Sequence, residues 1–267
     1  MPCCCFDASE YTGVPDTAPC PVSLDVPEII SRLDGLYNSG REAEAESFLE
    51  TQREKAVQVG DWRGELSILS ELLGQYRRSM KCDRAADAID SALDIIKEHH
   101  MGSTVSGATV LLNAATTLKC FGRSSEAVPI FRHVSRVFSD KLDPTDYRFA
   151  GLYNNMALAC ADVGDISGAE RLFALAMNIM KKQKNGENEL AVTLCNMAEM
   201  YDRLDAEDER IGQCLERAWE YLNTPGLPRD GYHAFTASKC APAFDRLGFF
   251  LYAAELYGRA RKIYDGT

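Results

Sequence analysis

The stretch GDISGAERLFALA at residues 164–176 carries the pattern that decides the fold. Its glycine is followed five residues later by Ala169, and four residues beyond that by a large apolar residue, Phe173. The same spacing, in the same register, starts at three other glycines: Gly40, Gly122 and Gly248. Gly122 and Gly164 are 42 residues apart. A fixed period in this range indicates a stacked array of one supersecondary unit, in which each unit buries its apolar face against its neighbours.

Two degenerate copies complete the series. They are Met80-Ala85-Ile89 and Ala206-Ile211-Leu215, and with them the alanine-type positions are 45, 85, 127, 169, 211 and 253. The sequence therefore predicts about six helix-turn-helix repeats, over 27–60, 61–101, 102–143, 144–185, 186–226 and 227–267. Residues 1–25 contain four prolines without a helical period, so we expect an irregular lead segment before an array over 26–267.

Each repeat is expected to contain two helices. In the fourth repeat, residues 153, 156, 157 and 160 lie on one helical face, and the stripe of Ala169, Phe173 and Ala176 faces it from the second helix. The predicted helices are 27–39, 42–59, 62–79, 83–99, 104–121, 124–140, 145–163, 166–183, 187–204, 208–223, 231–247 and 250–265. No segment alternates with a period of two, so the fold class is all-α without a sheet.

Composition excludes several classes of function. The chain has 267 residues, 46% of them hydrophobic, and a net charge of −11 without a block of lysine or arginine. Nucleic acid is therefore not an expected partner, because neutralising phosphates needs concentrated positive charge. No run approaches the roughly 20 apolar residues of a membrane span, and the N-terminus lacks the regions of a signal peptide. We expect a cytoplasmic protein that does not bind membranes.

Six of the ten cysteines lie singly in the predicted array and are interpreted as reduced packing residues, and the other four belong to the lead segment, which is interpreted as a tail without a function. Cys160 and Cys240 lie on the apolar stripes of their helices. A zinc site or a lipid on the lead segment is a weaker alternative, because adjacent cysteines cannot easily place all their sulfurs around one ion. The lead-segment cysteines are Cys3, Cys4, Cys5 and Cys20. We expect no metal and no cofactor.

The pattern Gly164-x4-Ala169-x3-Phe173-x2-Ala176, preceded by Asn155-Met156-Ala157, resembles the tetratricopeptide repeat (TPR). HEAT and armadillo repeats share the period range, but the glycine turn and the alanine–aromatic spacing favour TPR. The unit is longer than the usual TPR of about 34 residues and is similar to the repeats of kinesin light chains and of bacterial peptide-sensing regulators. Neither the coiled coil of the former nor the DNA-binding helix-turn-helix of the latter is recognisable here.

This resemblance implies a right-handed α-α superhelix whose first helices line a concave wall. It further implies a non-catalytic scaffold or adaptor that binds a protein or an extended peptide there. Two ladders of polar residues recur on the first helices. The first consists of Asn113, Asn155, Asn196 and Lys239, and the second of Arg77, Lys119, Arg203 and Arg246. An amide can donate and accept at once, which suits a peptide backbone, and the basic ladder favours an acidic peptide or a C-terminal carboxylate. Solvated, functionless side chains are the alternative for both ladders.

No phosphate-binding glycine loop, His-Glu-x-x-His helix or Cys-x-x-Cys pair occurs in the sequence, so we do not expect an enzyme. Two weaker alternatives are a cysteine-dependent enzyme, which needs a thiol of depressed pKa, and a peptide-sensing regulator without a DNA-binding domain. The alternative from another class is a self-assembling structural module. Apolar residues occupy more of the last predicted helix than its own repeat can cover, which predicts a homodimer contact or a docked partner there. The interface candidates are Phe250, Tyr252, Leu256 and Tyr264.

Overall fold

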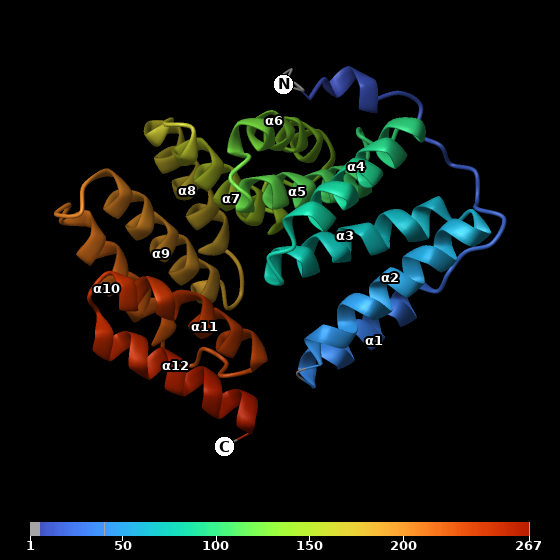
Figure 1. Cartoon of the computed structure of the whole chain (residues 1–267). Coiled ribbons are helices and arrows are strands. Elements are labelled where there is room, and N and C mark those ends of the chain that lie inside the picture. The colour runs from blue at the N-terminus through green and yellow to red at the C-terminus, as the bar shows by residue number, and fades with distance from the viewer. Residues whose placement is uncertain (1–5, 40, 267) are drawn as a thin grey trace. The chain divides into compact units, whose positions relative to one another are not determined.

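The helices expected from the sequence are confirmed. A computed structural model of the chain describes residues 6–39 and 41–266, and its helix bounds differ from the expected ones by at most three residues (Figure 1). The α-helices are α1 (Val26–Asn38), α2 (Glu42–Val59), α3 (Trp62–Arg78), α4 (Cys82–Glu98), α5 (Val105–Cys120), α6 (Ser124–Lys141), α7 (Arg148–Asp162), α8 (Ile166–Met180), α9 (Glu187–Leu204), α10 (Arg210–Leu222), α11 (Gly231–Arg246) and α12 (Phe250–Asp265). Within the described residues there is no strand, only an isolated antiparallel bridge between Thr12 and Met101. The fold is all-α, as expected.

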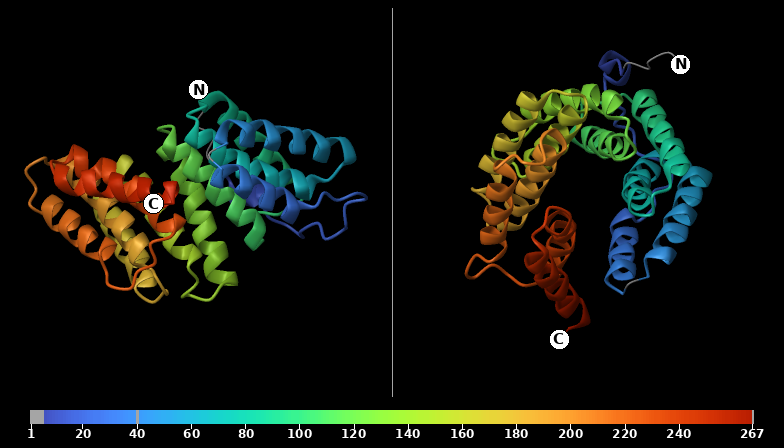
Figure 2. Two further views of the ribbon diagram at one scale, coloured as in Figure 1. Left: turned by 90° about the horizontal axis from the view of Figure 1, so that it is seen from below. Right: turned by 60° about the vertical axis from the view of Figure 1, so that its left-hand side comes forward.

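The chain divides into two compact units, an N-terminal unit (Met1–Leu142) and a C-terminal unit (Asp143–Thr267). Each unit is built from helix pairs, for example α5 with α6 and α11 with α12, which lie side by side in both views of Figure 2. The first helices of successive pairs also touch one another within a unit. In the N-terminal unit α3 contacts α1 and α5, and in the C-terminal unit α9 contacts α7 and α11. Each unit therefore has a wall of first helices, called the first-helix wall below.

The glycines of the repeat pattern make the turns inside the pairs. Gly122, Gly164 and Gly248 have φ angles of 76°, 87° and 88°, a left-handed conformation that only glycine adopts without steric cost. Gly40 lies outside the described residues. Of the two degenerate copies, Met80 keeps the left-handed turn with φ 54°. The other copy does not, because α9 ends on an extended Asp205.

The residue after Gly164 starts the second helix of its pair. The side chain of Asp165 accepts a hydrogen bond from the backbone N–H of Gly168 at 2.9 Å, which satisfies one of the free donors at the start of α8. Asp61 and Asp230 cap α3 and α11 in the same way, on Gly64 and His233. The quoted stretch thus encodes both the end of one helix and the beginning of the next.

The repeated apolar positions form the core of both units. All six alanine-type positions are buried, and so are five of the six large apolar positions that follow them. The buried large residues are Leu49, Ile89, Phe131, Phe173 and Leu215. The sixth, Tyr257 of α12, is 45% exposed. The last pair therefore differs from the others on its outer side.

The described part of the lead segment is fixed against the N-terminal unit. It contains one short 3₁₀ helix, η1 (Ala8–Tyr11). Arg63 of α3 donates to the backbone carbonyls of Asp16, at 2.7 Å, and of Ala18. His99, at the end of α4, lies 3.1 Å from the Asp16 carboxylate through Nδ1 and stacks on Trp62 with ring centroids 3.9 Å apart. These contacts connect residues 16–18 to α3 and α4.

Candidate functional site

The predicted ladder residues of the N-terminal unit connect neighbouring first helices. Asn113 of α5 donates from Nδ2 to the hydroxyl of Ser70 on α3, at 2.7 Å. In the opposite direction, Arg77 of α3 donates from Nη1 to the backbone carbonyl of Asn113, at 3.2 Å, and to Oγ1 of Thr117, at 2.9 Å. Asn113 and Arg77 are therefore brought together, and both help to hold α3 against α5.

Arg77 is half-buried, and this burial lowers the pKa of its guanidinium, with a smaller contribution from the positive charge of Arg78. The side chain is thus a structural link rather than a free cation on the wall. Lys119, the next member of the basic ladder, is half-buried on α5 and also interacts within the chain. Neither residue presents an unengaged positive charge in this unit.

In the C-terminal unit the asparagines make a similar link between first helices. Asn196 of α9 donates from Nδ2 to Oδ1 of Asn154 on α7, at 3.1 Å. Asn155 instead donates to the carbonyl of Gly151 in its own helix, at 3.0 Å. All three asparagines are half-buried. The contact partner of Asn196 is therefore Asn154, a residue that the sequence analysis did not single out.

The repeat period contains the signal for this partner. A step of 42 residues aligns Asn154 with Asn196, whereas it aligns Asn155 with Met197. In the predicted asparagine ladder the step from Asn155 to Asn196 is 41 residues, so these two residues occupy neighbouring and not equivalent positions of their repeats. In strict register, one column runs Asn113, Asn155, Met197 and Lys239, and Asn154 and Asn196 form a second column beside it.

Each amide of the wall keeps unused hydrogen-bonding capacity. The side-chain oxygens of Asn113, Asn155 and Asn196 accept no hydrogen bond from any residue in the described ranges. A carboxamide oxygen has two lone pairs and accepts readily from a backbone N–H. The hydrogen bonds of the Nδ2 groups hold these amides in place and leave their acceptors available.

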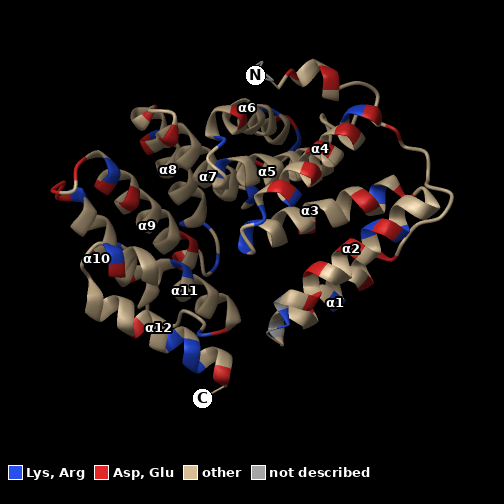
Figure 3. Cartoon of the chain, in the orientation of Figure 1, with Lys and Arg blue, Asp and Glu red and all other residues tan. Residues whose placement is uncertain are grey.

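The basic ladder of the C-terminal unit is neutralised by carboxylates. Arg203 of α9 pairs with Asp162 of α7, and Arg246 of α11 pairs with Glu199 of α9, each with 3.0 Å between nitrogen and oxygen. Such exposed pairs contribute at most about 1 kcal/mol each, but they cancel the positive charge that the ladder was expected to present. Figure 3 shows both signs of charge along the helices of this unit.

Lys239, the last member of the asparagine ladder, differs from these paired arginines. Within the described parts of the chain its Nζ forms no ion pair, and it lies 6.0 Å from the ring centroid of Phe235. Its nearest acidic influence is Glu189 of α9, whose pKa is raised by burial and lowered to a smaller extent by Lys239. Lys239 is exposed. The wall of the C-terminal unit therefore offers one accessible cation.

Two exposed aromatic residues stand beside Lys239, and the sequence analysis missed both. Tyr232 and Phe235 precede it by seven and four residues on α11, and their rings are stacked with centroids 6.4 Å apart. Their exposed fractions are 48% and 52%. The spacing of aromatic residues and lysine at 232, 235 and 239 could have indicated one helical face. We call Asn154, Asn155, Asn196, Tyr232, Phe235 and Lys239 together the amide–aromatic face.

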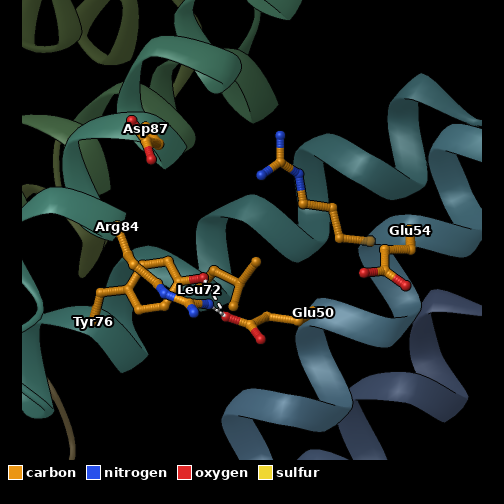
Figure 4. Close-up of a pocket in the computed structure, with 7 residues that line it drawn as sticks. Glu50, Glu54, Leu72, Tyr76, Arg84 and Asp87 are labelled. Carbon is orange, nitrogen blue, oxygen red and sulfur yellow. Dashed lines mark hydrogen bonds and ion pairs between the residues drawn. The ribbon is translucent and has the colours of Figure 1, made fainter.

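A separate hollow of about 280 Å³ lies in the N-terminal unit, lined by residues of α2, α3 and α4. In Figure 4 the side chains of Glu50, Tyr76 and Arg84 point toward one another. Tyr76 donates to Glu50 at 3.1 Å, and Arg84 forms an ion pair with the same carboxylate. Burial, followed by Glu50, raises the pKa of Tyr76 to about 12, so the phenol stays protonated at neutral pH. In this hollow the polar side chains of Glu50, Tyr76 and Arg84 are therefore paired with one another.

The cysteines in the described ranges are free thiols, and Cys160 and Cys240 are buried, as their positions on the apolar stripes indicate. The pKa of Cys214 is raised to about 11 by burial, and the pKa of Cys195 is raised by a hydrogen bond with Cys240 and by burial. These shifts disfavour the thiolate that a cysteine nucleophile requires. Cys3, Cys4 and Cys5 lie outside the described residues. No group of three or more potential metal ligands occurs within the described ones.

The interface candidates on α12 separate into inward and outward residues. Leu256 is fully buried, so its assignment to an interface is wrong: it belongs to the core of the last pair. Tyr252 faces α10, where its ring stacks on Trp219 at 4.2 Å. Phe250 and Tyr264 are exposed, at 65% and 61%. Counting apolar residues did not determine which side of α12 is covered.

Similarity to known proteins is found at the level of structure. No protein-family model matches the chain, and no curated protein matches it in sequence. A structure of nearly identical TPR-like repeats assigned to a kinesin light chain of Podosopora anserina aligns with a TM-score of 0.51 and 16% identity, over 74% of this chain and 94% of that one. BtubC (BKLC) of P. vanneervenii aligns with a TM-score of 0.52 and 16% identity, over 91% and 92%. The fold is therefore that of TPR-like repeat proteins, as the glycine–alanine–aromatic pattern predicts.

Proposed function

We propose that this chain is a protein-interaction scaffold that holds an extended peptide along the first-helix wall of its C-terminal unit. The observation that carries the proposal is the pair of unused amide oxygens on Asn155 and Asn196, each positioned by a hydrogen bond of its own Nδ2. Asn113 has the same arrangement on the wall of the N-terminal unit. An extended peptide has N–H groups that need acceptors, whatever its side chains are. Acceptors fixed in advance bind such a backbone with little loss of conformational entropy.

The amide–aromatic face supports the same function in the C-terminal unit. Lys239 can bind a carboxylate, from an acidic side chain or from the C-terminus of a peptide, because it has no ion pair within the described residues. Arg203 and Arg246 are already paired and would contribute little. The preference for an acidic ligand is thus proposed to depend on Lys239 alone in this unit.

A peptide selection tests the proposal. Random peptides displayed on phage are selected on the full chain, and the affinity of the best peptide is measured by fluorescence anisotropy. Replacing both Asn155 and Asn196 by Ala removes two acceptors worth roughly 0.5–1.5 kcal/mol each, so binding should weaken about tenfold.

Asn178→Ala is the matched control, since Asn178 is exposed on α8, a second helix of the same unit. This variant should bind like the wild type. If the double variant and the wild type bound the peptide with equal affinity, and circular dichroism were unchanged, peptide binding along the first-helix wall would be refuted. A selection that yields no peptide would do the same.

Self-association is the second candidate function, and it would involve a different surface. The observation that favours it is the exposure of apolar residues along the outer side of α12.

No described helix is long and apolar enough to cross a membrane.

A further inference from the structure

The outer side of α12 exposes a stripe of apolar and small residues, which is interrupted by the charged Arg261 and Asp265. The apolar and small residues are Phe250, Leu251, Ala254, Tyr257, Gly258 and Tyr264, which we call the α12 outer face. Leu251 is 86% exposed and Tyr257 45%. At 3.6 residues per turn, positions separated by 4, 7, 8 and 14 residues share one side of a helix. The aromatic members, Phe250, Tyr257 and Tyr264, follow one another at steps of seven.

The repeat register shows what this face corresponds to. Tyr257 lies 84 residues, two periods, after Phe173 of α8, and Tyr264 lies 84 after Met180. Phe173 and Met180 are buried, and α8 packs against the following first helix, α9. The same positions of α12 are uncovered in the described chain. The α12 outer face is therefore the side by which a second helix in this array packs against another helix.

The shape of the face allows a close approach. At Gly258 an added Cβ would meet no atom within 4 Å, so the backbone of α12 is open there. Ala254, one turn earlier, is also exposed. At the start of the helix lies a hollow of about 400 Å³, lined by Gly248 to Tyr252 and mostly apolar. Small residues at the middle and large ones at both ends give ridges and recesses that can interlock.

A head-to-tail contact between copies does not fit the chemistry of α1. A further repeat would meet α12 with a first helix, and α1 is the first helix without a preceding pair in the described chain. Apart from Pro27, its exposed positions are polar or glycine: Glu28, Ser31, Arg32, Asp34 and Gly35. This surface would leave charges unpaired against the aromatic stripe of a second copy.

A tail-to-tail contact satisfies both the apolar stripe and the charges beside it. Glu255 and Lys262 lie on the same flank of the stripe, and Glu255 also pairs with Arg259 of its own helix at 2.6 Å. When two such helices pair antiparallel, the same flanks face each other, so each Glu255 lies opposite a Lys262. A parallel pair would not bring these opposite charges together. The charged residues within the stripe, Arg261 and Asp265, already pair with each other at 3.4 Å.

We propose that α12 is a self-association surface, which pairs antiparallel with α12 of a second copy around a two-fold axis near Gly258. Phe250 of one copy then packs near Tyr264 of the other, and the open backbone at Gly258 accommodates the partner's Tyr257. The contact is isologous and therefore closes at two copies. It rests on the second candidate function proposed above, and it leaves the amide–aromatic face out of the contact stripe, so it is independent of peptide binding.

Sedimentation equilibrium of the full chain over a wide concentration range tests the proposal. The wild type should sediment as a monomer–dimer equilibrium without larger species. Leu251→Glu and Tyr257→Glu should each weaken dimerisation by about tenfold or more, because a two-fold contact buries every introduced charge twice. Leu175→Glu is the matched control: Leu175 is 46% exposed, like Tyr257, but lies on α8. It should dimerise like the wild type.

A charge exchange tests the antiparallel orientation. Lys262→Glu should weaken the dimer about fivefold by placing like charges opposite each other, and the double variant Glu255→Lys/Lys262→Glu should recover most of this loss. A monomer at every concentration, an open series of oligomers, or a dimer unaffected by Leu251→Glu and Tyr257→Glu would overturn the proposal. A double variant no tighter than Lys262→Glu would overturn the antiparallel pairing.

Discussion

Replacing Phe173 by Ala tests the repeat register at its most buried point. Phe173 lies on α8, is fully buried, and belongs to the stripe that packs α8 between α7 and α9. Removing the ring deletes its buried apolar area and leaves a cavity that the neighbouring helices can only partly close. For a Phe→Ala change in a core, the two effects together cost about 3–5 kcal/mol of unfolding free energy.

The chain offers its own comparison for this substitution. Tyr257 stands two repeat periods later at the same position of α12, where it is 45% exposed. Tyr257→Ala should therefore cost only about 1 kcal/mol in the monomer. Lys182→Ala, at an exposed position just after α8, should cost under about 0.5 kcal/mol.

Urea denaturation followed by circular dichroism measures all three variants, at a protein concentration low enough to keep the chain monomeric. The free energies of unfolding should rank wild type, Lys182→Ala, Tyr257→Ala and Phe173→Ala from most to least stable. Similar losses for Phe173→Ala and Tyr257→Ala would mean that the two positions are equally covered, and the register would be wrong.

Three further predictions concern buried or linking groups. Burial, with Arg229 and Arg259 nearby, lowers the pKa of His233 from 6.5 to about 4. Because the imidazole therefore binds a proton more tightly in the unfolded chain than in the folded one, the free energy of unfolding should fall as pH drops from about 6.5 toward 4. His233→Asn should reduce this pH dependence in urea titrations at pH 7 and pH 5. A maleimide should label the exposed Cys82 quickly and the buried Cys240 only on unfolding, as read by mass spectrometry; rapid labelling of both would contradict the packing assignment. Arg63→Ala should release the lead segment from α3 and speed hydrogen exchange at residues 16–18 without lowering the exchange protection of α8.

Most of the fold could be predicted from the sequence because its signals are local. The left-handed turn at Gly164, the cap at Asp165 and the alanine–aromatic stripe that follows act within one repeat, and the period of 42 residues carries them along the chain. Met80 shows the limit of this reasoning, since a turn can keep its left-handed geometry without glycine. Ala206 shows the opposite case, where the register persists and the turn changes.

The candidate site was less predictable because it depends on contacts between repeats. Sequence spacing placed Asn196 on the first-helix wall but could not show that its partner is Asn154. It also could not show that Arg203 and Arg246 are neutralised, because Asp162 and Glu199 lie on different helices from the arginines that they meet. The assignment of Leu256 to an interface was wrong for a similar reason, since only packing against the neighbouring helix determines which side of α12 is buried.

The central claim is that fixed amide oxygens of the wall accept hydrogen bonds from a peptide backbone. A double-mutant cycle on one selected peptide tests it most directly. Each backbone nitrogen of the peptide is methylated in turn, which removes one N–H and leaves every side chain in place. Fluorescence anisotropy then gives the affinity of each peptide for the wild type and for Asn196→Ala.

If this proposal holds, methylation at one particular position weakens binding to the wild type by about fivefold and hardly affects binding to Asn196→Ala, giving a coupling energy of roughly 1 kcal/mol. If methylation at every position weakens both proteins equally, the Asn196 side chain does not bind the peptide backbone, and the proposed function is contradicted.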